Sequence, residues 1–285
     1  MNDKNLTWEQ AVQWLRERPE QQSLVRTCYY DDPLLEAAQR FANSDEWKAT
    51  ELLLPEHRGR ALDLGAGRGI SSFALAQAGW DVTALEPDSS LLVGSGAIRA
   101  LSSESGLPMN VIEDYGETIP FEANSFDLVY GRQVLHHARD LTRLCREVSR
   151  VLKSTGLFIA TREHVISHKS DLPFFLEQHP LHKLYGGENA FILKDYLAAI
   201  TGSNLRVERT IGPFESAINY FPLTHEEWYQ ISIAPLARIV SHPVATRFTQ
   251  EQTRFGRWVL TKLALFRSNL NRSPGRLYSF VARKP

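Results

Sequence analysis

Apolar residues in the first two thirds of the chain form short runs that are separated by stretches with helical spacing. The short runs predict β-strands at 61–64, 81–85, 109–112, 126–130 and 157–161. Between them, apolar residues recur every three or four positions, which predicts helices from about 70, over 89–105 and over 141–152. Strands that alternate with helices in this way are typical of an α/β protein with a mostly parallel sheet.

Helices are also predicted at both ends of the chain. Thr7 is a candidate N-cap of the first helix, and a second helix follows over about 33–54 with a break near Asn43 and Ser44. Near the other end, alternating residues predict a strand at 205–211, and the last strand is expected at 276–282. The residues between these two strands predict further helices, near 226–236 and 246–270.

Three glycines follow the strand at 61–64. Gly65, Gly67 and Gly69 let the backbone turn sharply and bring free N–H groups close to a ligand, and the positive end of the next helix favours a negative group there. Glu86 ends the following strand, about twenty residues later, where a carboxylate can accept hydrogen bonds from both hydroxyls of a ribose. The pattern therefore predicts a bound nucleoside cofactor.

The spacing of these residues distinguishes between cofactors. The glycines follow a Gly-x-Gly-x-Gly pattern and not the Gly-x-Gly-x-x-Gly of dinucleotide sites, and Asp63 would repel a pyrophosphate but suits a sulfonium or amino cation. Together with Glu86-Pro87-Asp88 and the block at 126–137, these residues resemble the class I (Rossmann-like) S-adenosylmethionine-dependent methyltransferases, in their small-molecule "type 11"-like branch. The resemblance implies an α/β fold with a doubly wound, seven-stranded, mostly parallel sheet of order 3-2-1-4-5-7-6.

The resemblance also implies a division of the chain into parts. In such proteins the N-terminal helices fold over the cofactor as a lid, and a short hairpin joins the last two strands. Here that hairpin is replaced by a long insertion. The expected parts are the N-terminal helices or lid (1–54), the S-adenosylmethionine-binding core (55–211), the helical insertion (212–275) and the last strand of the core sheet (276–285).

By the same resemblance, the cofactor is contacted by residues at strand ends and in the loops that follow them. Asp63 and the glycine turn are expected at the methionine part, and Glu86 at the ribose. At the adenine, Tyr115 stands where the family usually has Asp, so either Asp114 binds the amino group or Tyr115 packs on the ring. The full set of expected cofactor-binding residues is Asp63, Gly65, Ala66, Gly67, Glu86, Pro87, Asp114, Tyr115, Gly116 and Arg132.

Polar and aromatic residues near the carboxyl ends of the strands predict an acceptor site. Strand propensity gives no reason for charged residues directly after 157–161, so their presence indicates a site. Tyr29 and Tyr30 belong either to this site or to aromatic packing under a helix. The expected substrate-binding residues are Tyr29, Tyr30, Gln133, Arg162, Glu163, His179 and Glu188.

Histidines are the candidate catalytic groups because they titrate near neutral pH. His164 follows the fifth strand and is predicted to be the general base for an oxygen acceptor, with His137 and His182 as alternatives. One of His136 and His137 is expected to border the reactive methyl, and the alternative is a histidine that only caps or packs at a helix start. No metal site is expected, because Pro180 interrupts the helical geometry that would align His179 with His182.

Composition narrows the function further. The chain has 285 residues with 32 basic and 33 acidic side chains, so no overall field favours nucleic acid as a partner. The N-terminus lacks the apolar core of a signal peptide and no apolar run is long enough to cross a membrane, which predicts a cytoplasmic protein. The two cysteines are not at metal-type or redox-type spacing.

The sequence therefore predicts an S-adenosylmethionine-dependent methyltransferase that acts on a small-molecule or carrier-linked sugar or lipid acceptor, with O-methylation and a histidine base as the specific form. Two alternatives remain: a catalytically inactive S-adenosylmethionine-binding partner subunit, and a nicotinamide-dependent oxidoreductase. The segment 246–270 mixes cationic and aromatic residues around most of a helix. It is expected to form a pocket wall or homodimer contact, or else to contact a membrane surface.

Overall fold

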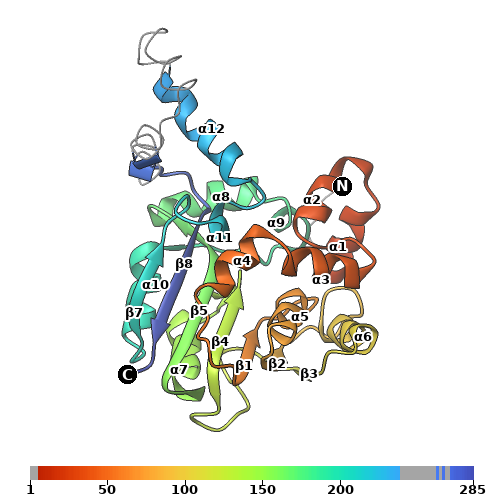
Figure 1. Ribbon diagram of the computed structural model, residues 1–285. Helices are drawn as coiled ribbons and strands as arrows, with labels where there is room; N and C mark the ends of the chain where they lie inside the picture. The colour runs from red at the N-terminus through yellow and green to blue at the C-terminus, as the bar shows by residue number, and fades with distance from the viewer. Residues whose placement is uncertain (1–5, 238–260, 263–264, 267–269) are drawn as a thin grey trace.

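A single twisted sheet organises the chain. The computed structural model describes residues 6–237, 261–262, 265–266 and 270–285. Within them, an eight-stranded sheet has the order β3-β2-β1-β4-β5-β8-β7, with β6 paired to β5 beside this path (Figure 1). The strands are β1 (Arg60–Leu64), β2 (Asp81–Leu85), β3 (Met109–Ile112), β4 (Phe126–Arg132), β5 (Leu152–Ile166), β6 (Phe191–Ile192), β7 (Arg206–Ile211) and β8 (Arg276–Arg283).

The sheet confirms the predicted topology. β1 lies parallel to β2 and β4, and β4 lies parallel to β5. β8 runs antiparallel between β5 and β7, so the last strand of the chain is inserted next to the edge of the sheet. Without the two-residue β6, the order is the predicted 3-2-1-4-5-7-6.

Helices cover both faces of the sheet and form two hydrophobic cores. One core joins the strands to α3, α5 and α6, and the other joins them to α7 and α10. Parallel strands buried on both faces explain why β1 and β4 read as nearly continuous apolar runs. The helices are α1 (Trp8–Arg16), α2 (Gln22–Thr27), α3 (Leu34–Ala42), α4 (Asp45–Glu51), α5 (Ile70–Gln77), α6 (Ser95–Ser105), α7 (Leu141–Val151), α8 (Leu172–Gln178), α9 (His182–Tyr185), α10 (Leu193–Thr201), α11 (Ala217–Tyr220) and α12 (His225–Ala237).

Side-chain caps define where several helices begin. Thr7 accepts a hydrogen bond from the backbone N–H of Gln10, and the Gln10 side chain accepts one from the N–H of Thr7, which makes the predicted N-cap a full capping box. The break predicted near Asn43 and Ser44 divides the helix over 33–54 into α3 and α4, and the Ser44 hydroxyl caps α4 by accepting a hydrogen bond from the Trp47 N–H.

Several element boundaries differ from the prediction. The helix expected from 89 begins only at Ser95, because the Ser95 N–H is already bonded to the Asp88 carbonyl in the preceding turn. β5 is much longer than expected, since it continues past an irregular register between Ala160 and Glu163 and reaches Ile166. α12 matches the helix expected near 226–236, whereas most of the helix expected at 246–270 lies outside the described residues.

The N-terminal helices pack beside the carboxyl ends of β1 and β2. α3 packs against α5, and residues of α1 and α2 share a small hydrophobic cluster with Leu181 and Leu184. α1, α2 and α3 lie on the side of the molecule that holds α5 (Figure 1), and Trp8 borders the same cavity as Gly65 and Gly67. Within the part of the chain that the structure describes, no helix combines the length and hydropathy needed to span a bilayer.

Candidate active site

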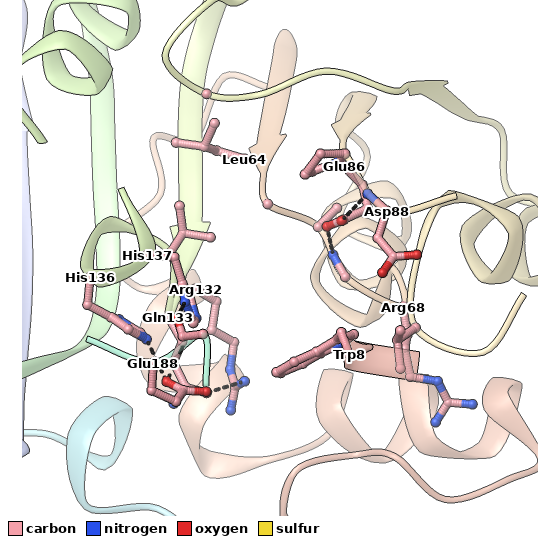
Figure 2. Close-up of a pocket in the computed structure, with 18 of the residues that line it drawn as sticks. Trp8, Leu64, Arg68, Glu86, Asp88, Arg132, Gln133, His136, His137 and Glu188 are labelled. Atoms are coloured by element: carbon pink, nitrogen blue, oxygen red, sulfur yellow. Dashed lines mark hydrogen bonds and ion pairs between the residues drawn. The ribbon is translucent and has the colours of Figure 1, made fainter. Parts of the chain in front are cut away.

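A cavity of about 710 Å³ opens where β1, β2 and β4 end. Its walls come from the glycine turn, the loops after β2, β3 and β4, the N-terminal segment and residues 179–188. Figure 2 shows Glu86 and Asp88 on one side of the cavity and His136 and Glu188 on the other. The volume falls in the usual range of small-molecule sites, about 300–1,000 Å³.

The glycine turn needs glycine for both conformation and space. Gly65 and Gly67 have φ values of 61° and 54°, in the left-handed region that side chains disfavour. A Cβ atom on Gly65 would also lie only 2.2 Å from the Val134 side chain, whereas nothing comes closer than 3.9 Å at Gly67. Both glycines border the cavity, as the sequence predicts. The turn therefore presents bare backbone to a ligand.

Glu86 is fixed beside this turn by two backbone groups. Its carboxylate accepts hydrogen bonds from the Gly67 N–H at 2.7 Å and the Asp88 N–H at 2.9 Å. Burial raises the pKa of Glu86 to about 7, although these two hydrogen bonds lower it. A carboxyl group held at the cavity wall in this way is well placed to accept hydrogen bonds from vicinal hydroxyls.

Asp63, which is expected at the methionine part of the cofactor, lies near the end of β1, two residues before Gly65. Its side chain is fully buried beneath the turn and accepts hydrogen bonds from the hydroxyls of Ser71 at 2.8 Å and Ser72 at 2.6 Å. Burial raises the pKa of Asp63 to about 6. Asp63 is absent from the described residues that border the cavity, while Ser71 is among them. Asp63 Oδ2 thus holds the start of α5, while its Oδ1 has no hydrogen-bond partner among the described residues. The predicted role of Asp63 at the methionine part of the cofactor stays a prediction.

The loop after β3 forms the wall expected for an adenine ring. Asp114, Tyr115 and Gly116 all border the cavity. The Asp114 carboxylate accepts a hydrogen bond from the Tyr115 N–H at 2.7 Å, and the Tyr115 ring is 55% exposed. The structure thus keeps both predicted options open: the second oxygen of Asp114 or the face of Tyr115 could meet a base.

Arg132 borders the cavity but is held by a buried acid that the sequence analysis did not identify. Glu46, on α4, is 0% exposed and accepts hydrogen bonds from the Arg132 guanidinium at 2.6 and 3.1 Å. Burial lowers the pKa of Arg132, but the Glu46 charge outweighs it and keeps this group protonated. Arg132 also donates to the side chain of Gln133 at 3.0 Å. A lid helix thereby orients two residues of the cavity.

Arg68, also missed by the sequence analysis, joins the glycine turn to the N-terminal segment. Its guanidinium donates to the carbonyls of Tyr29 at 2.9 Å and Asp31 at 3.0 Å and to the Asp32 carboxylate at 2.6 Å. Tyr29 and Tyr30 border the cavity as predicted, and Trp8 joins them.

Aromatic contacts order this part of the wall. Trp8 packs edge-on against Tyr30 and Tyr185, with ring centroids 5.9 and 4.7 Å apart. The Tyr29 ring packs edge-on against Phe41 at 5.4 Å. Tyr29 and Tyr30 thus border the cavity and also pack against aromatic rings, while their contact with a substrate stays a prediction.

His136 is the most strongly anchored histidine at the other end of the cavity. Its Nδ1 lies 2.7 Å from Glu163, and its Nε2 lies 3.6 Å from Glu188. Burial lowers the pKa of His136, but Glu163 and Glu188 outweigh this and raise it to about 9. The sequence analysis selected the adjacent His137 because a strand exit does not reveal which of two consecutive histidines turns inward.

His164 and His137 border the same end of the cavity in different environments. The His164 Nδ1 lies 3.1 Å from the Gly275 carbonyl, and burial lowers the pKa of His164 to about 3. The His137 side chain is 36% exposed, and its Nδ1 lies 3.1 Å from the Gly187 carbonyl. His179 and Glu188 complete this end of the wall, as expected of substrate-binding positions.

Besides Asp63, three predicted site residues are absent from the described residues that line the cavity: Arg162, Glu163 and His182. The Arg162 guanidinium donates to the carbonyls of Ile218 at 2.9 Å and Phe221 at 3.0 Å. The Glu163 carboxylate accepts hydrogen bonds from three consecutive N–H groups, of Val134, Leu135 and His136. Arg162 and Glu163 are thus engaged with backbone groups beside the cavity, and their predicted contact with a substrate stays a prediction.

Comparison with known proteins agrees with this arrangement. Residues 62–160 match the family described as "Methyltransferase domain". The chain is 34% identical over 105 residues to the sarcosine/dimethylglycine N-methyltransferase of Aphanothece halophytica, a match that covers 36% of this chain and 37% of that protein. It is 29% identical over 99 residues to the ubiquinone biosynthesis O-methyltransferase of a Methylobacterium species, covering 35% and 39%. The matches thus span less than half the length of these relatives.

A solved structure extends the likeness to nearly the whole chain. The geranyl diphosphate C-methyltransferase of Streptomyces coelicolor superposes with a TM-score of 0.58 at 14% identity, covering 90% of this chain and 88% of the other. The sheet order and the cavity at the ends of β1, β2 and β4 define the class I methyltransferase fold. Residues 62–160, which match the methyltransferase-domain model, lie within this fold.

Proposed function

We propose that this protein transfers a methyl group from S-adenosylmethionine to a small-molecule or carrier-linked acceptor. The observation that carries the proposal is one continuous cavity that joins the glycine turn and Glu86 to the histidines after β4 and β5. A cofactor and an acceptor can therefore occupy the two ends of the same space. The named relatives also concern small molecules, namely sarcosine or dimethylglycine and the ubiquinone pathway.

The cofactor occupies the end near Glu86 in this proposal. The Glu86 carboxylate accepts hydrogen bonds from the ribose hydroxyls, and the backbone of Gly65 and Gly67 lies against the methionine part. The adenine lies beside Asp114 and Tyr115. This orientation directs the sulfonium methyl toward Arg132 and the histidine end of the cavity.

Methyl transfer needs alignment more than activation, because the sulfonium already carries a good leaving group. Holding the nucleophile, the methyl carbon and the sulfur in line can supply about 7–11 kcal/mol of the barrier. For a hydroxyl acceptor, the acceptor oxygen forms a bond to the methyl carbon while the carbon–sulfur bond breaks. The electron pair of the broken carbon–sulfur bond stays on sulfur. The products are the methyl ether and S-adenosylhomocysteine, and the hydroxyl proton must be accepted.

We assign the proton acceptor to His137 in preference to the originally expected His164. The His137 side chain borders the cavity, is 36% exposed and lies next to Glu188, which can stabilise the imidazolium that forms. His164 instead faces His136, Phe175 and His179, with ring centroids 4.7, 5.0 and 5.4 Å away. A base enclosed by other rings is poorly placed to receive a proton from an incoming acceptor.

Calorimetric binding of S-adenosylhomocysteine tests the cofactor assignment. Glu86→Ala should weaken binding at least about tenfold, because two charge-assisted hydrogen bonds are lost. Glu122→Ala, which changes an exposed acid elsewhere, is the matched control and should bind like the unmodified protein. Equal affinity in Glu86→Ala and Glu122→Ala would contradict the ribose assignment.

A further inference from the structure

Three potential metal ligands converge at the histidine end of the cavity. His136, His164 and Glu188 each offer one ligand atom, and these atoms all lie within 4.8 Å of one another. They come from three separate places: the turn after β4, the strand β5 and the loop before β6. The grouping is therefore a product of the fold and not of sequence spacing.

We propose that His136, His164 and Glu188 bind a divalent transition-metal ion. The proposal rests on these side chains alone and does not depend on the proposed methyl transfer. It also revises the expectation of no metal, which considered only the alignment of His179 with His182. The ligands proposed here are different residues, brought together by strands that are distant in the sequence.

The Nδ1 atoms of His136 and His164 already make hydrogen bonds of the kind that metal-bound histidines make through the ring nitrogen that does not bind the metal. The Nδ1 of His136 lies 2.7 Å from the Glu163 carboxylate, and the Nδ1 of His164 lies 3.1 Å from the Gly275 carbonyl. Both partners can only accept, so each Nδ1 carries a proton and donates it. This leaves Nε2 of each ring available for a metal, and such carboxylate or carbonyl partners are typical of metal-bound histidine.

Distances within the group fit an ion better than a direct hydrogen bond. The Nε2 of His136 and the nearest Glu188 oxygen are 3.6 Å apart, which is too long for a hydrogen bond. Ligand atoms about 2.0–2.2 Å from one metal ion lie about 3–3.5 Å from each other in tetrahedral or octahedral geometry. This pair is therefore already close to the separation that a shared ion imposes. Because all the ligand atoms lie within 4.8 Å of one another, no pair needs to contract by more than about 1.3–1.8 Å.

Buried charge also favours an ion at this position. Glu163 is 0% exposed and Glu188 is 7% exposed, and both lie against the same His136 ring. Two buried carboxylates need compensating positive charge. A dication bound by neutral histidines balances both carboxylates, whereas protonation of His136 alone supplies one charge.

Two more histidines border the proposed ion. The Nε2 atoms of His137 and His179 each lie 3.9 Å from the same Glu188 oxygen. The buried Nδ1 of His179 has no hydrogen-bond partner among the described residues. Small ring movements would allow His179 to serve as a fourth ligand.

The donor set selects the class of metal. Imidazole nitrogens with one carboxylate suit zinc, cobalt, iron or nickel, whereas magnesium and calcium favour oxygen ligands. Because the group borders the cavity, at least one coordination position faces the space assigned to the acceptor. If the proposed function holds, that position suits an acceptor with a hydroxyl or carboxylate oxygen.

Cobalt binding tests the proposal directly. The full chain, purified without a histidine tag and freed of metal with a chelator, is titrated with Co²⁺ and followed by visible absorption and calorimetry. We expect one Co²⁺ per chain, and about 10–100-fold weaker binding in His164→Ala and Glu188→Gln. His57→Ala, which removes an exposed histidine far from the cavity, should bind like the unmodified chain.

The proposal is overturned if the unmodified chain binds no stoichiometric Co²⁺, or if Glu188→Gln binds as tightly as the unmodified chain. Circular dichroism establishes that each variant is folded, and Glu188→Gln, which keeps the side-chain shape, decides the matter if His164→Ala does not fold. S-adenosylhomocysteine affinity is measured on the same samples. Cobalt binding without S-adenosylhomocysteine binding would support the metal site and count against the proposed function, so the two failures are distinguishable.

Discussion

The ionisation of Glu86 should make the free energy of unfolding of the protein depend on pH. Its folded pKa of about 7 lies above the ordinary value of 4.5. Below pH 4.5 the carboxyl is protonated in both folded and unfolded chains. Between pH 4.5 and 7 only the unfolded chain ionises, so this group's contribution to the free energy of unfolding falls as pH rises and is lost above about pH 7.

Glu86→Gln should remove this pH dependence. Between pH 4.5 and pH 8, the free energy of unfolding of the variant should rise by about 1–3 kcal/mol relative to that of the unmodified protein. Urea denaturation of the ligand-free proteins at the two pH values measures this difference. A constant difference between variant and unmodified protein across this range would contradict the raised pKa.

The same residue predicts the pH dependence of cofactor binding. The ionised carboxylate is the stronger acceptor for ribose hydroxyls, so S-adenosylhomocysteine should bind about tenfold more weakly at pH 6 than at pH 8. The pH dependence should disappear in Glu86→Gln. Calorimetry at several pH values provides the measurement, and a parallel pH slope in Glu86→Gln would assign the proton to another group.

Two features of Gly65 disfavour a side chain: its positive φ and its close approach to Val134. A pair of variants can separate their effects. Gly65→Ala places a side chain at positive φ and against Val134, whereas Gly106→Ala has a similar φ, of 70°, and nothing within 4 Å of its Cβ. Gly106→Ala should cost about 1–2 kcal/mol of stability. Gly65→Ala should cost more in thermal or urea unfolding and also weaken S-adenosylhomocysteine binding. An equal loss of stability in Gly65→Ala and Gly106→Ala would show that the Val134 side chain moves away from a new Cβ at position 65 at no cost.

At the scale of elements, the N-terminal lid depends on one arginine of the glycine turn. Arg68 makes hydrogen bonds to Tyr29, Asp31 and Asp32, and its side chain is only 5% exposed. Arg16 also pairs with Asp32, so two arginines meet one carboxylate. The cofactor end of the cavity and the lid therefore share a single set of contacts.

Arg68→Met should release the lid while leaving the sheet intact. Hydrogen exchange of residues 8–32 should speed up, and S-adenosylhomocysteine should bind more weakly, because the wall formed by this segment is less ordered. Arg26→Met is the matched control. The Arg26 side chain is 70% exposed, and its guanidinium lies 4.0 Å from the Asp31 carboxylate, which is a long ion pair. Unchanged exchange in Arg68→Met would show that apolar packing alone holds the lid.

Strand patterns predicted the sheet well but not the direction of individual side chains at strand ends. β1, β2 and β4 were predictable because a buried parallel strand leaves a local apolar run. Arg162 and Glu163 were expected in the cavity, yet β5 changes register between Ala160 and Glu163, and Arg162 takes a φ of 61°. Such a local irregularity leaves no periodic signal in the sequence.

At the scale of the whole molecule, the site depends on contacts between distant parts of the chain. Glu46 pairs with Arg132, and Glu163 with His136, although neither pair is close in sequence. The glycine turn and the ribose acid were predictable because a short motif carries them. The buried partners were not, because pairing across the fold is fixed only when the sheet and lid are assembled. The roles assigned to the predicted site residues stay predictions.

The most direct test of the central claim is transfer of a labelled methyl group from S-adenosylmethionine to fractionated cell extract of the source organism. We predict that the unmodified protein releases S-adenosylhomocysteine and labels one small-molecule or carrier-linked fraction. His137→Ala should bind S-adenosylhomocysteine normally and lose most of the transfer to a hydroxyl acceptor, about 10²–10⁴-fold. If the unmodified protein binds the cofactor but labels no fraction, the account is contradicted and the chain is a cofactor-binding subunit without transferase activity.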